Sequence, residues 1–325
     1  MPILVLSEAD VTAALTPHQA IESQRIAYTA VINGSGRLLA ATRATDPATD
    51  ALTFALTGMI RGRTGMAGKF GLQRRHNAEW GPSLQAFVLL LDPETAVPIA
   101  CLNGTAITTL RTSAGLAVAA DALAPSSART LGVLGSGVQA ASTVRMMATV
   151  RSLRTVAVWS PTQVNRQRLA KSLREELGLD VRAVGTARDA VTGSEIVSAC
   201  TLSVKPVIHG KWLHPGQTIL TMGSYEPGRL EIDLTTSARG TTFVDLLVKC
   251  RTQCGPLIEA LDAGTITEAE VKEIGTVLEG HHPGRRNANE ILIFHSIGIG
   301  YQDAAAGWAA YQNALARGLG VTVEF

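Results

Sequence analysis

Apolar and polar positions in the first part of the chain predict helices followed by a β-sheet. The spacing of apolar residues indicates helices at 7–15 and 17–33, and Pro17 suits the first turn of the second because no N–H is needed there. A third helix, rich in alanine, leucine and threonine, is expected at 105–123. Short apolar runs predict strands at 52–60, 66–72, 84–91 and 99–102. This order indicates an α+β domain with an antiparallel sheet.

Further along, the pattern changes to a regular alternation of strands and helices. Strands are expected at 130–134, 155–160, 180–184, 196–200, 218–222 and 242–245, with a further candidate at 291–294. Such alternation predicts an α/β fold with a Rossmann-type, doubly wound parallel sheet. The boundary is expected near Pro125, so that 124–299 form the Rossmann domain. An alanine-rich helix at about 302–317 returns to the first domain, which then comprises 1–123 and 300–325.

A glycine-rich loop joins the first strand of this second domain to its first helix. The apolar run 131–134 ends in Gly135-Ser-Gly137, and a helical pattern with a small residue at Ala140 follows. The first glycine permits a tight turn, the second lets the backbone approach a pyrophosphate, and Ala140 allows close packing of helix on strand. The free amides at the helix start form an anion site. A dinucleotide is therefore expected on the loop and the first helical residues: Gly135, Gly137, Val138 and Gln139.

The second strand of this domain indicates which dinucleotide is bound. NAD-selective sites place an acid at the end of that strand, about 20 residues beyond the glycines, to bind the ribose 2′-hydroxyl. Here the strand ends in Ser160, and no acidic residue occurs between Ala140 and Arg174. Hydroxyl groups and an arginine would bind a 2′-phosphate. NADP(H) is therefore favoured, with NAD(H) as the alternative, and the expected contacts are Ser160, Thr162, Asn165 and Arg166.

Composition narrows the remaining function classes. With 46% hydrophobic and 17% charged residues and a net charge of +2, the chain fits a globular protein and gives no sign of nucleic-acid or membrane partners. No run approaches the ~20 apolar residues of a membrane span, and the amino terminus lacks the pattern of a signal peptide. Four scattered cysteines indicate a reduced, cytoplasmic setting and no metal site. The expected partner is a small molecule.

Five segments at matching spacings together resemble the ornithine cyclodeaminase/mu-crystallin family. They are Gly68-Lys69, the strand from Pro82 to Pro93, Leu110–Ala114, Leu134–Ala140 and Phe294–Gly298. The resemblance runs over nearly the whole length. It implies a homodimer whose first domain builds the subunit interface and part of the substrate site, while the second domain holds the nicotinamide cofactor. Members include cyclodeaminases, alanine dehydrogenase and reductases of cyclic or linear imino acids.

Within this resemblance, three cations are expected at the substrate. Arg111 offers a planar fork for an α-carboxylate, and Arg43 resembles the family's third cation there. Lys69 lies on a strand amid apolar residues, where partial desolvation would favour its neutral form and suit it to proton transfer or to hydrogen-bonding an imine. The other matching positions line the family's cofactor pocket: Gln85, Thr112 and Ser296.

One departure from the family pattern indicates the type of reaction. Cyclodeaminases carry a catalytic aspartate in a Gly-Ala-Asp motif, and Tyr225 occupies that position here. A phenol cannot act as a carboxylate base near neutrality, although it can donate a hydrogen bond and bound a pocket. The leading hypothesis is therefore an NADPH-dependent reductase of cyclic imino acids, an oxidoreductase acting on C=N groups. Its catalytic residues would be Lys69, Arg111 and Tyr225.

Three other functions stay open at this point. An ornithine cyclodeaminase could use Glu226 in place of the aspartate. A reductase of open-chain imino acids would use the extra cations in 71–77, among them His76, for a second carboxylate. A non-enzymatic NADP-binding module would bind without turnover. His295 is expected either to touch the nicotinamide or to pack in the core.

Overall fold

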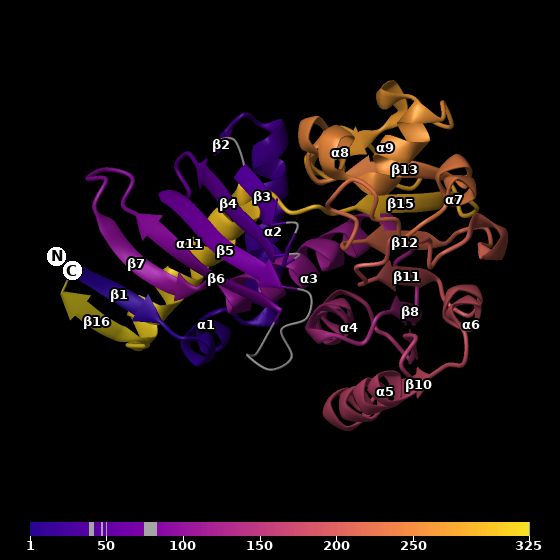
Figure 1. Cartoon of the computed structure of the whole chain (residues 1–325), viewed down its shortest axis with the longest axis horizontal. Helices are drawn as coiled ribbons and strands as arrows, with labels where there is room; N and C mark the ends of the chain where they lie inside the picture. The colour runs from indigo at the N-terminus through magenta and orange to yellow at the C-terminus, as the bar shows by residue number, and fades with distance from the viewer. Residues whose placement is uncertain (39–41, 47, 50, 75–82, 325) are drawn as a thin grey trace. The chain divides into compact units, whose positions relative to one another are not determined.

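The computed structural model describes residues 1–38, 42–46, 48–49, 51–74 and 83–324. The chain forms two compact units, a first unit of Met1–Arg111 with Ile299–Phe325 and a second unit of Thr112–Gly298. Each unit is built on a β-sheet of its own (Figure 1). The division falls inside one continuous helix, α3 (Gly104–Leu123), so this helix contributes residues to both units.

The sheet of the first unit has the strand order β16-β1-β7-β6-β5-β4-β2, with β3 paired to β4. Its strands are β1 (Pro2–Leu6), β2 (Gly36–Leu38), β3 (Thr42–Asp46), β4 (Ala51–Ile60), β5 (Met66–Arg74), β6 (Leu84–Leu91), β7 (Pro98–Asn103) and β16 (Val321–Glu324). The four predicted strands are confirmed as β4 to β7. The antiparallel pairing predicted for these four strands is confirmed. The sheet also contains a parallel pair that was not predicted, because β1 pairs parallel to β7 and antiparallel to β16.

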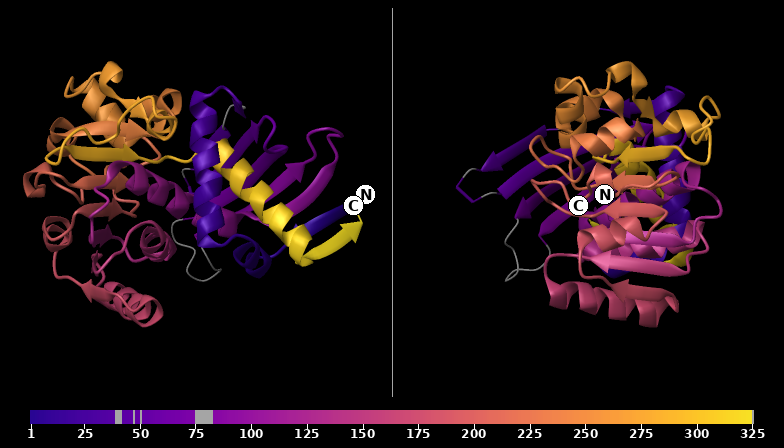
Figure 2. Two further views of the ribbon diagram at one scale, coloured as in Figure 1. Left: turned by 180° about the vertical axis from the view of Figure 1, so that it is seen from behind. Right: turned by 90° about the vertical axis from the view of Figure 1, so that its right-hand side faces the viewer.

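Three helices belong to this first unit: α1 (Glu8–Ala14), α2 (Pro17–Ile32) and α11 (Gly300–Arg317). Reciprocal capping boxes begin α1 at Ser7 and α2 at Thr16, each with a side-chain oxygen that accepts a backbone N–H of the first turn. Figure 2 shows α2 and α11 side by side against one face of the sheet. At the start of α11 a Cβ on Gly300 would lie 2.0 Å from the carbonyl oxygen of Thr57, so only glycine lets the helix approach β4 this closely.

The sheet of the second unit is parallel throughout its described pairs and has the order β10-β9-β8-β11-β12-β15-β13-β14. Its strands are β8 (Thr130–Leu134), β9 (Thr155–Trp159), β10 (Asp180–Ala183), β11 (Ile196–Ala199), β12 (Thr218–Thr221), β13 (Gly240–Val244), β14 (Lys272–Glu273) and β15 (Ile291–His295). The predicted doubly wound Rossmann sheet is confirmed. The strand order reverses between β8 and β11, and ligands of such sheets bind beyond the carboxyl ends of the strands at this point.

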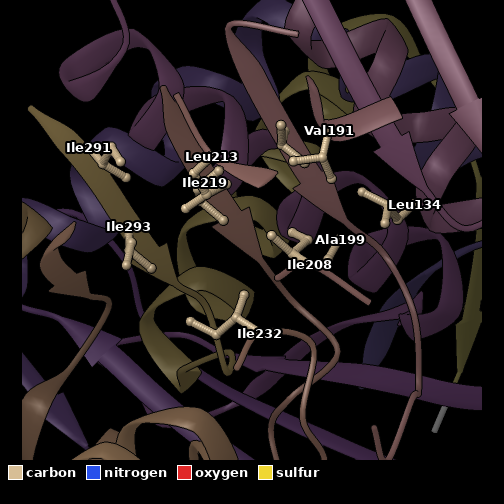
Figure 3. Close-up of a cluster of buried hydrophobic side chains, with 10 residues drawn as sticks. Leu134, Val191, Ala199, Ile208, Leu213, Ile219, Ile232, Ile291 and Ile293 are labelled. Carbon is tan, nitrogen blue, oxygen red and sulfur yellow. The ribbon is translucent and has the colours of Figure 1, made fainter. Parts of the chain in front are cut away.

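Helices connect these parallel strands, and apolar side chains fill the space beneath them. The helices are α4 (Val138–Val150), α5 (Gln163–Leu177), α6 (Ala187–Thr192), α7 (Leu234–Arg239), α8 (Leu247–Gln253), α9 (Gly255–Asp262) and α10 (Ile274–Leu278), with 3₁₀ turns at Gly210–Trp212 and Glu268–Glu270. One buried cluster joins residues of β8, β11, β12 and β15 to the connecting segments, including Leu134, Ile219 and Ile293 (Figure 3). In the described part of the chain, every helix is too short or too polar to span a bilayer.

Candidate active site

The glycine loop of the second unit has the geometry that a dinucleotide site needs. Gly135 adopts φ +124°, and a Cβ there would lie 2.5 Å from the carbonyl oxygen of Cys200 on the neighbouring strand end. Gly137 is the N-cap of α4, and a Cβ at this position would meet no atom within 4 Å. The first glycine is therefore required by the protein's own packing. The second keeps the helix start open to an approaching anion.

Two buried polar atoms near these strand ends have no hydrogen-bond partner among the described residues. They are Oε1 of Gln139, in the first turn of α4, and Oγ of Ser296, directly after β15. Buried polar atoms in folded proteins are almost always hydrogen-bonded, so atoms of this kind indicate a missing ligand or water. Both belong to residues expected at the cofactor, and the residues present therefore fit a nicotinamide dinucleotide.

Beyond β9, the expected 2′-phosphate residues come together on one turn. Ser160 is buried, and its hydroxyl donates to the carbonyl oxygen of Thr162 at 3.3 Å. Arg166 donates through Nη1 to the carbonyl oxygen of Ser160 at 2.8 Å, which holds the guanidinium against this turn. Thr162 and Asn165 are exposed at the start of α5. The turn thus presents a cation and hydroxyl groups where an NAD-selective site presents an acid.

Glu231, not among the residues predicted from the sequence, holds two loops together at this edge of the sheet. Its buried carboxylate accepts the backbone N–H of Thr201 at 2.8 Å after β11, and those of Met222 at 3.2 Å and Gly223 at 2.7 Å after β12. The hydroxyl groups of Thr201 and Ser224 donate to it as well. Burial raises the pKa of Glu231 to about 7, although these hydrogen bonds act in the opposite direction. Glu231 therefore fixes the loops nearest the reversal of strand order.

Tyr225 follows β12 and packs on its own unit. Its ring lies against a cluster of buried residues that includes Cys250 and Leu257, and the Arg229 guanidinium carbon lies 5.5 Å from the ring centroid. Glu226 accepts a 2.8 Å hydrogen bond from Nε of the same arginine. The carboxylate that could replace the cyclodeaminase aspartate is thus held in an ion pair.

The segment after β15 is held by buried polar groups. Nδ1 of His295 lies 2.8 Å from the hydroxyl of Thr221 on β12, and burial lowers the pKa of His295 to about 4, so its ring is neutral at physiological pH. Asp245 accepts the backbone N–H groups of Ile297 at 2.8 Å and Gly298 at 2.9 Å. Ser296 is therefore presented on a backbone that is tied down on both sides.

In the first unit, two of the expected substrate cations converge on one acid. Lys69 on β5, Arg111 on α3 and Asp303 in the first turn of α11 are all buried. The Lys69 ammonium lies 2.7 Å from Oδ1 of Asp303, and Nε of Arg111 lies 3.2 Å from the same oxygen. Thr108, one turn before Arg111 on α3, also accepts from Lys69 at 3.3 Å. This arrangement differs from the expected partly desolvated, neutral lysine, because an opposite charge in contact favours the ammonium.

Gln302 sets the orientation of the arginine. Its Oε1 accepts from Nη1 of Arg111 at 3.3 Å and from the backbone N–H of Ile299 at 3.0 Å, while its Nε2 donates to the Tyr28 hydroxyl at 3.1 Å. Nε and Nη1 of Arg111 are thus engaged, whereas its Nη2 donates to none of the residues that the structure describes. Nη2 of this nearly buried guanidinium is therefore available as a donor to a ligand.

The other expected residues are distributed between the units. Arg43 on β3 is paired across the strands with Phe54, whose ring centroid lies 5.7 Å from the Lys69 ammonium. Gln85 is exposed on β6, and Thr112 is buried on α3 directly after the division between the units. Of the extra cations in 71–77, His76 and its neighbours from 75 onward lie outside the described residues. No cluster of metal-binding side chains occurs in the part of the chain that is described.

Comparison with known proteins identifies the family. The ornithine cyclodeaminase/mu-crystallin family model matches residues 68–318. The chain belongs to this family. An iminosuccinate reductase of Paracoccus denitrificans is 31% identical over 327 residues, covering 99% of this chain and 100% of that protein.

Two solved structures extend the likeness to the whole fold. The Δ1-pyrroline-2-carboxylate reductase of Thermococcus litoralis, in complex with NADH and L-proline, matches with a TM-score of 0.96 at 28% identity, covering 99% of this chain and 100% of that one. An archaeal alanine dehydrogenase dimer with bound NAD matches with a TM-score of 0.93 at 25% identity, covering 100% of both chains. The resemblance and the fold class predicted from the sequence are both confirmed.

Proposed function

We propose that this chain is an NADPH-dependent reductase of cyclic imino acids, converting Δ1-pyrroline-2-carboxylate to L-proline, Δ1-piperideine-2-carboxylate to L-pipecolate, or both. The observation that carries the proposal is the buried pair of cations, Lys69 and Arg111, held on Asp303 in the first unit. The charges of these three side chains sum to +1, so one bound carboxylate would make the group neutral. The family relatives that reduce iminosuccinate and Δ1-pyrroline-2-carboxylate support an enzyme acting on C=N groups.

The substrate carboxylate would be anchored by Arg111. Its Nε and Nη1 are engaged by Asp303 and Gln302, which leaves Nη2 as the donor for an anion. A charge-assisted hydrogen bond in this buried setting is about twice as strong as a neutral one. Arg43, on β3, is proposed as the second contact to the carboxylate. Tyr225 is proposed to bound the substrate ring.

Lys69 would supply the proton of the reaction. Reduction of an imine adds a hydride to carbon and a proton to nitrogen, so the carbon–nitrogen double bond becomes a CH–NH single bond. The nicotinamide, when bound, supplies the hydride. The ammonium of Lys69, favoured by Asp303 at 2.7 Å, can hydrogen-bond the ring nitrogen and give it the proton, which is then replaced from solvent.

The preference for NADPH is proposed from this chain's own residues. The reductase and dehydrogenase neighbours hold NADH or NAD in their structures, which supports a nicotinamide dinucleotide without selecting the phosphate. Here Ser160 lies in the turn after β9, Arg166 on α5 donates to its carbonyl oxygen, and no acid lies between Ala140 and Arg174. The residues that would hold the cofactor are Gln85, Thr112, Gly135, Gly137, Val138, Gln139, Ser160, Thr162, Asn165, Arg166 and Ser296.

A homodimer in the cytoplasm is proposed as the working form, with the first unit as the interface. Phe70 on β5 and Phe87 on β6 are stacked with ring centroids 5.5 Å apart, and both are exposed. Leu72 is exposed on the same strand as Phe70, two residues along. Exposed apolar groups of this kind mark interaction surfaces, and the archaeal alanine dehydrogenase neighbour is a dimer. Sedimentation of the wild type and of F87K would test this proposal, with a monomeric wild type as the contrary result.

The direct test is loss of NADPH absorbance with each cyclic imine, repeated with NADH. Turnover with at least one imine, abolished by R111M and K69M while NADPH binding persists, is the expected result. Turnover of neither imine above the enzyme-free rate would refute the proposal. Release of ammonia from L-ornithine with catalytic NAD would instead indicate a cyclodeaminase.

Iminosuccinate is the second candidate substrate, favoured by the full-length likeness to the Paracoccus denitrificans reductase. Iminosuccinate carries two carboxylates. Arg74 lies at the end of β5, the same strand as Lys69, and is the cation proposed for the second carboxylate. Including iminosuccinate in the same NADPH and NADH assays separates the two candidates by their kcat/KM values. The cyclodeaminase reading is weakened by the ion pair between Glu226 and Arg229.

A further inference from the structure

The strongest unassigned feature is the acid between the two cations. The side chains of Asp303 and Lys69 are each only 1% exposed, and Asp303 receives both Lys69 and Arg111 on a single oxygen. Burial of an ionised carboxylate is costly unless it is paired and hydrogen-bonded. Asp303 has two cationic partners and also lies in the first turn of the 18-residue helix α11, where the helix dipole favours a negative charge. Its carboxylate is therefore ionised.

We propose that Asp303 is a positioning residue of the imine site, which keeps Lys69 as an ammonium and turns Arg111 so that its Nη2 faces the substrate carboxylate. The inference rests on the proposed function and assigns a role that the relatives' activities do not specify. Asp303 and Gln302 are adjacent in the same helical turn and engage Nε and Nη1 of Arg111 respectively. Because a guanidinium is planar, engagement of these two nitrogens fixes the direction of the third.

The close approach of α11 to β4 makes this geometry depend on the helix start. Gly58 on β4 and Gly300 on α11 face one another, and a Cβ on Gly58 would lie 2.5 Å from the Gly300 carbonyl carbon. Asp303 is one turn further along the helix. This close packing places Asp303 at the buried face of β5, where Lys69 and Ala67 lie. Phe70 points to the opposite, exposed face of the same strand.

The test replaces the charge and then restores it. In D303N, Lys69 is expected to lose its proton at a pH lower by about one unit or more. NMR of ¹³C-labelled lysine follows this titration, and the K69R variant assigns the Lys69 signal. Under the proposed function, kcat/KM for the cyclic imine falls at least tenfold and its alkaline limb moves to lower pH, while the Kd for NADPH stays within twofold. D262N, at an exposed acid of α9, serves as the matched control and should change none of these values.

D303E provides a second measurement if D303N folds poorly, as judged by circular dichroism. It keeps the charge but lengthens the side chain, so the Lys69 titration should stay near the wild-type value while KM for the imine rises at least fivefold. An unchanged Lys69 titration in folded D303N, or an unchanged KM in D303E, would overturn the inference. If the wild type reduces no imine, the proposed function fails, and the Lys69 titration alone still decides whether Asp303 sets the lysine's charge.

Discussion

Arg166 offers a sharp test of cofactor choice, because its contacts predict a large effect on one dinucleotide and a small effect on the other. The guanidinium is held at the turn after β9 by the 2.8 Å hydrogen bond to the Ser160 carbonyl. From this position Arg166 is proposed to donate to the 2′-phosphate of NADPH, and a hydrogen bond to a charged group contributes about 1.5–3 kcal/mol, or roughly 10- to 150-fold in Kd. Arg166 is partly exposed, so screening favours the lower end of this range. R166Q should therefore weaken NADPH about tenfold and NADH less than twofold.

Fluorescence titration of both reduced cofactors measures the two values on the same protein samples. Arg168 is exposed two positions along α5, a spacing that does not share a helix face, and R168Q is the matched control. The ratio of the NADH and NADPH dissociation constants should also fall as ionic strength rises, because the added contact is ionic. Equal losses of both cofactors in R166Q would refute this reasoning, since Arg166 would then only support the turn at Ser160.

Three further predictions concern stability. Burial lowers the pKa of His295 from 6.5 to about 4, so between these values the unfolded chain binds a proton at this residue that the native chain does not, and the His295 contribution to stability should rise with pH by about 3 kcal/mol. Glu231, whose pKa burial raises to about 7, contributes in the opposite direction, so the stability of the wild type is compared with that of H295N. In urea titrations the difference between the two proteins should shift by about 3 kcal/mol in favour of the wild type from pH 4 to pH 7, and an unchanged difference would contradict the argument. G300A should lose about 1–3 kcal/mol through overpacking against Thr57, whereas G307A on the same helix should stay within about 1 kcal/mol, and equal midpoints would contradict the packing argument. R151M should lose about 1–3 kcal/mol, because this buried arginine donates to the carbonyl groups of Ala120, Asp121 and Ala124 at the end of α3, and methionine leaves these acceptors without this donor. The Asp121 carboxylate, 34% exposed, can be solvated after the change; an unchanged midpoint in thermal unfolding would count against the argument.

The second unit could be predicted closely because its signals are local. Gly135 needs a positive φ and directly follows an apolar strand, and the helix begins at Val138, so the three residues 135–137 define the loop. The central parallel strands β8, β11 and β12 are short, largely apolar runs buried on both faces, and the alternation with helices sets the topology. The one strand missed there, β14, has only two residues and no apolar run of its own.

The acid of the first-unit site could not be predicted by the same means, because its partners are distant in the chain. Asp303 meets Lys69 across 234 positions, and no local spacing relates them. The available signal was a single acid at the start of a helix, directly before Ala304, Ala305 and Ala306. Glu231, between Leu230 and Ile232, carries the same signal of an acid embedded in apolar residues. A charge in such a setting is paired or hydrogen-bonded when buried.

The edge strands of the first sheet illustrate a second limit. β1 and β16 pair with each other in register from Pro2 with Glu324 to Val5 with Val321. Either segment alone is four or five residues long and reads equally well as a loop. Their pairing depends on the two ends of the chain meeting, which hydrophobic periodicity within a window does not report.

The split of the first unit between the beginning and the end of the chain also bears on how the protein is made. Lys69 and Arg111 leave the ribosome long before Asp303 is translated, whereas the second unit is one continuous segment from Thr112 to Gly298. Domains fold as units during synthesis, so the Rossmann sheet can form while the first sheet still lacks β16 and α11. The two cations that are buried in the folded protein therefore remain solvated until residues 299–325 have been synthesised. In nascent chains stalled before Asp303, the face of the first sheet that α11 covers is exposed and accessible to a chaperone.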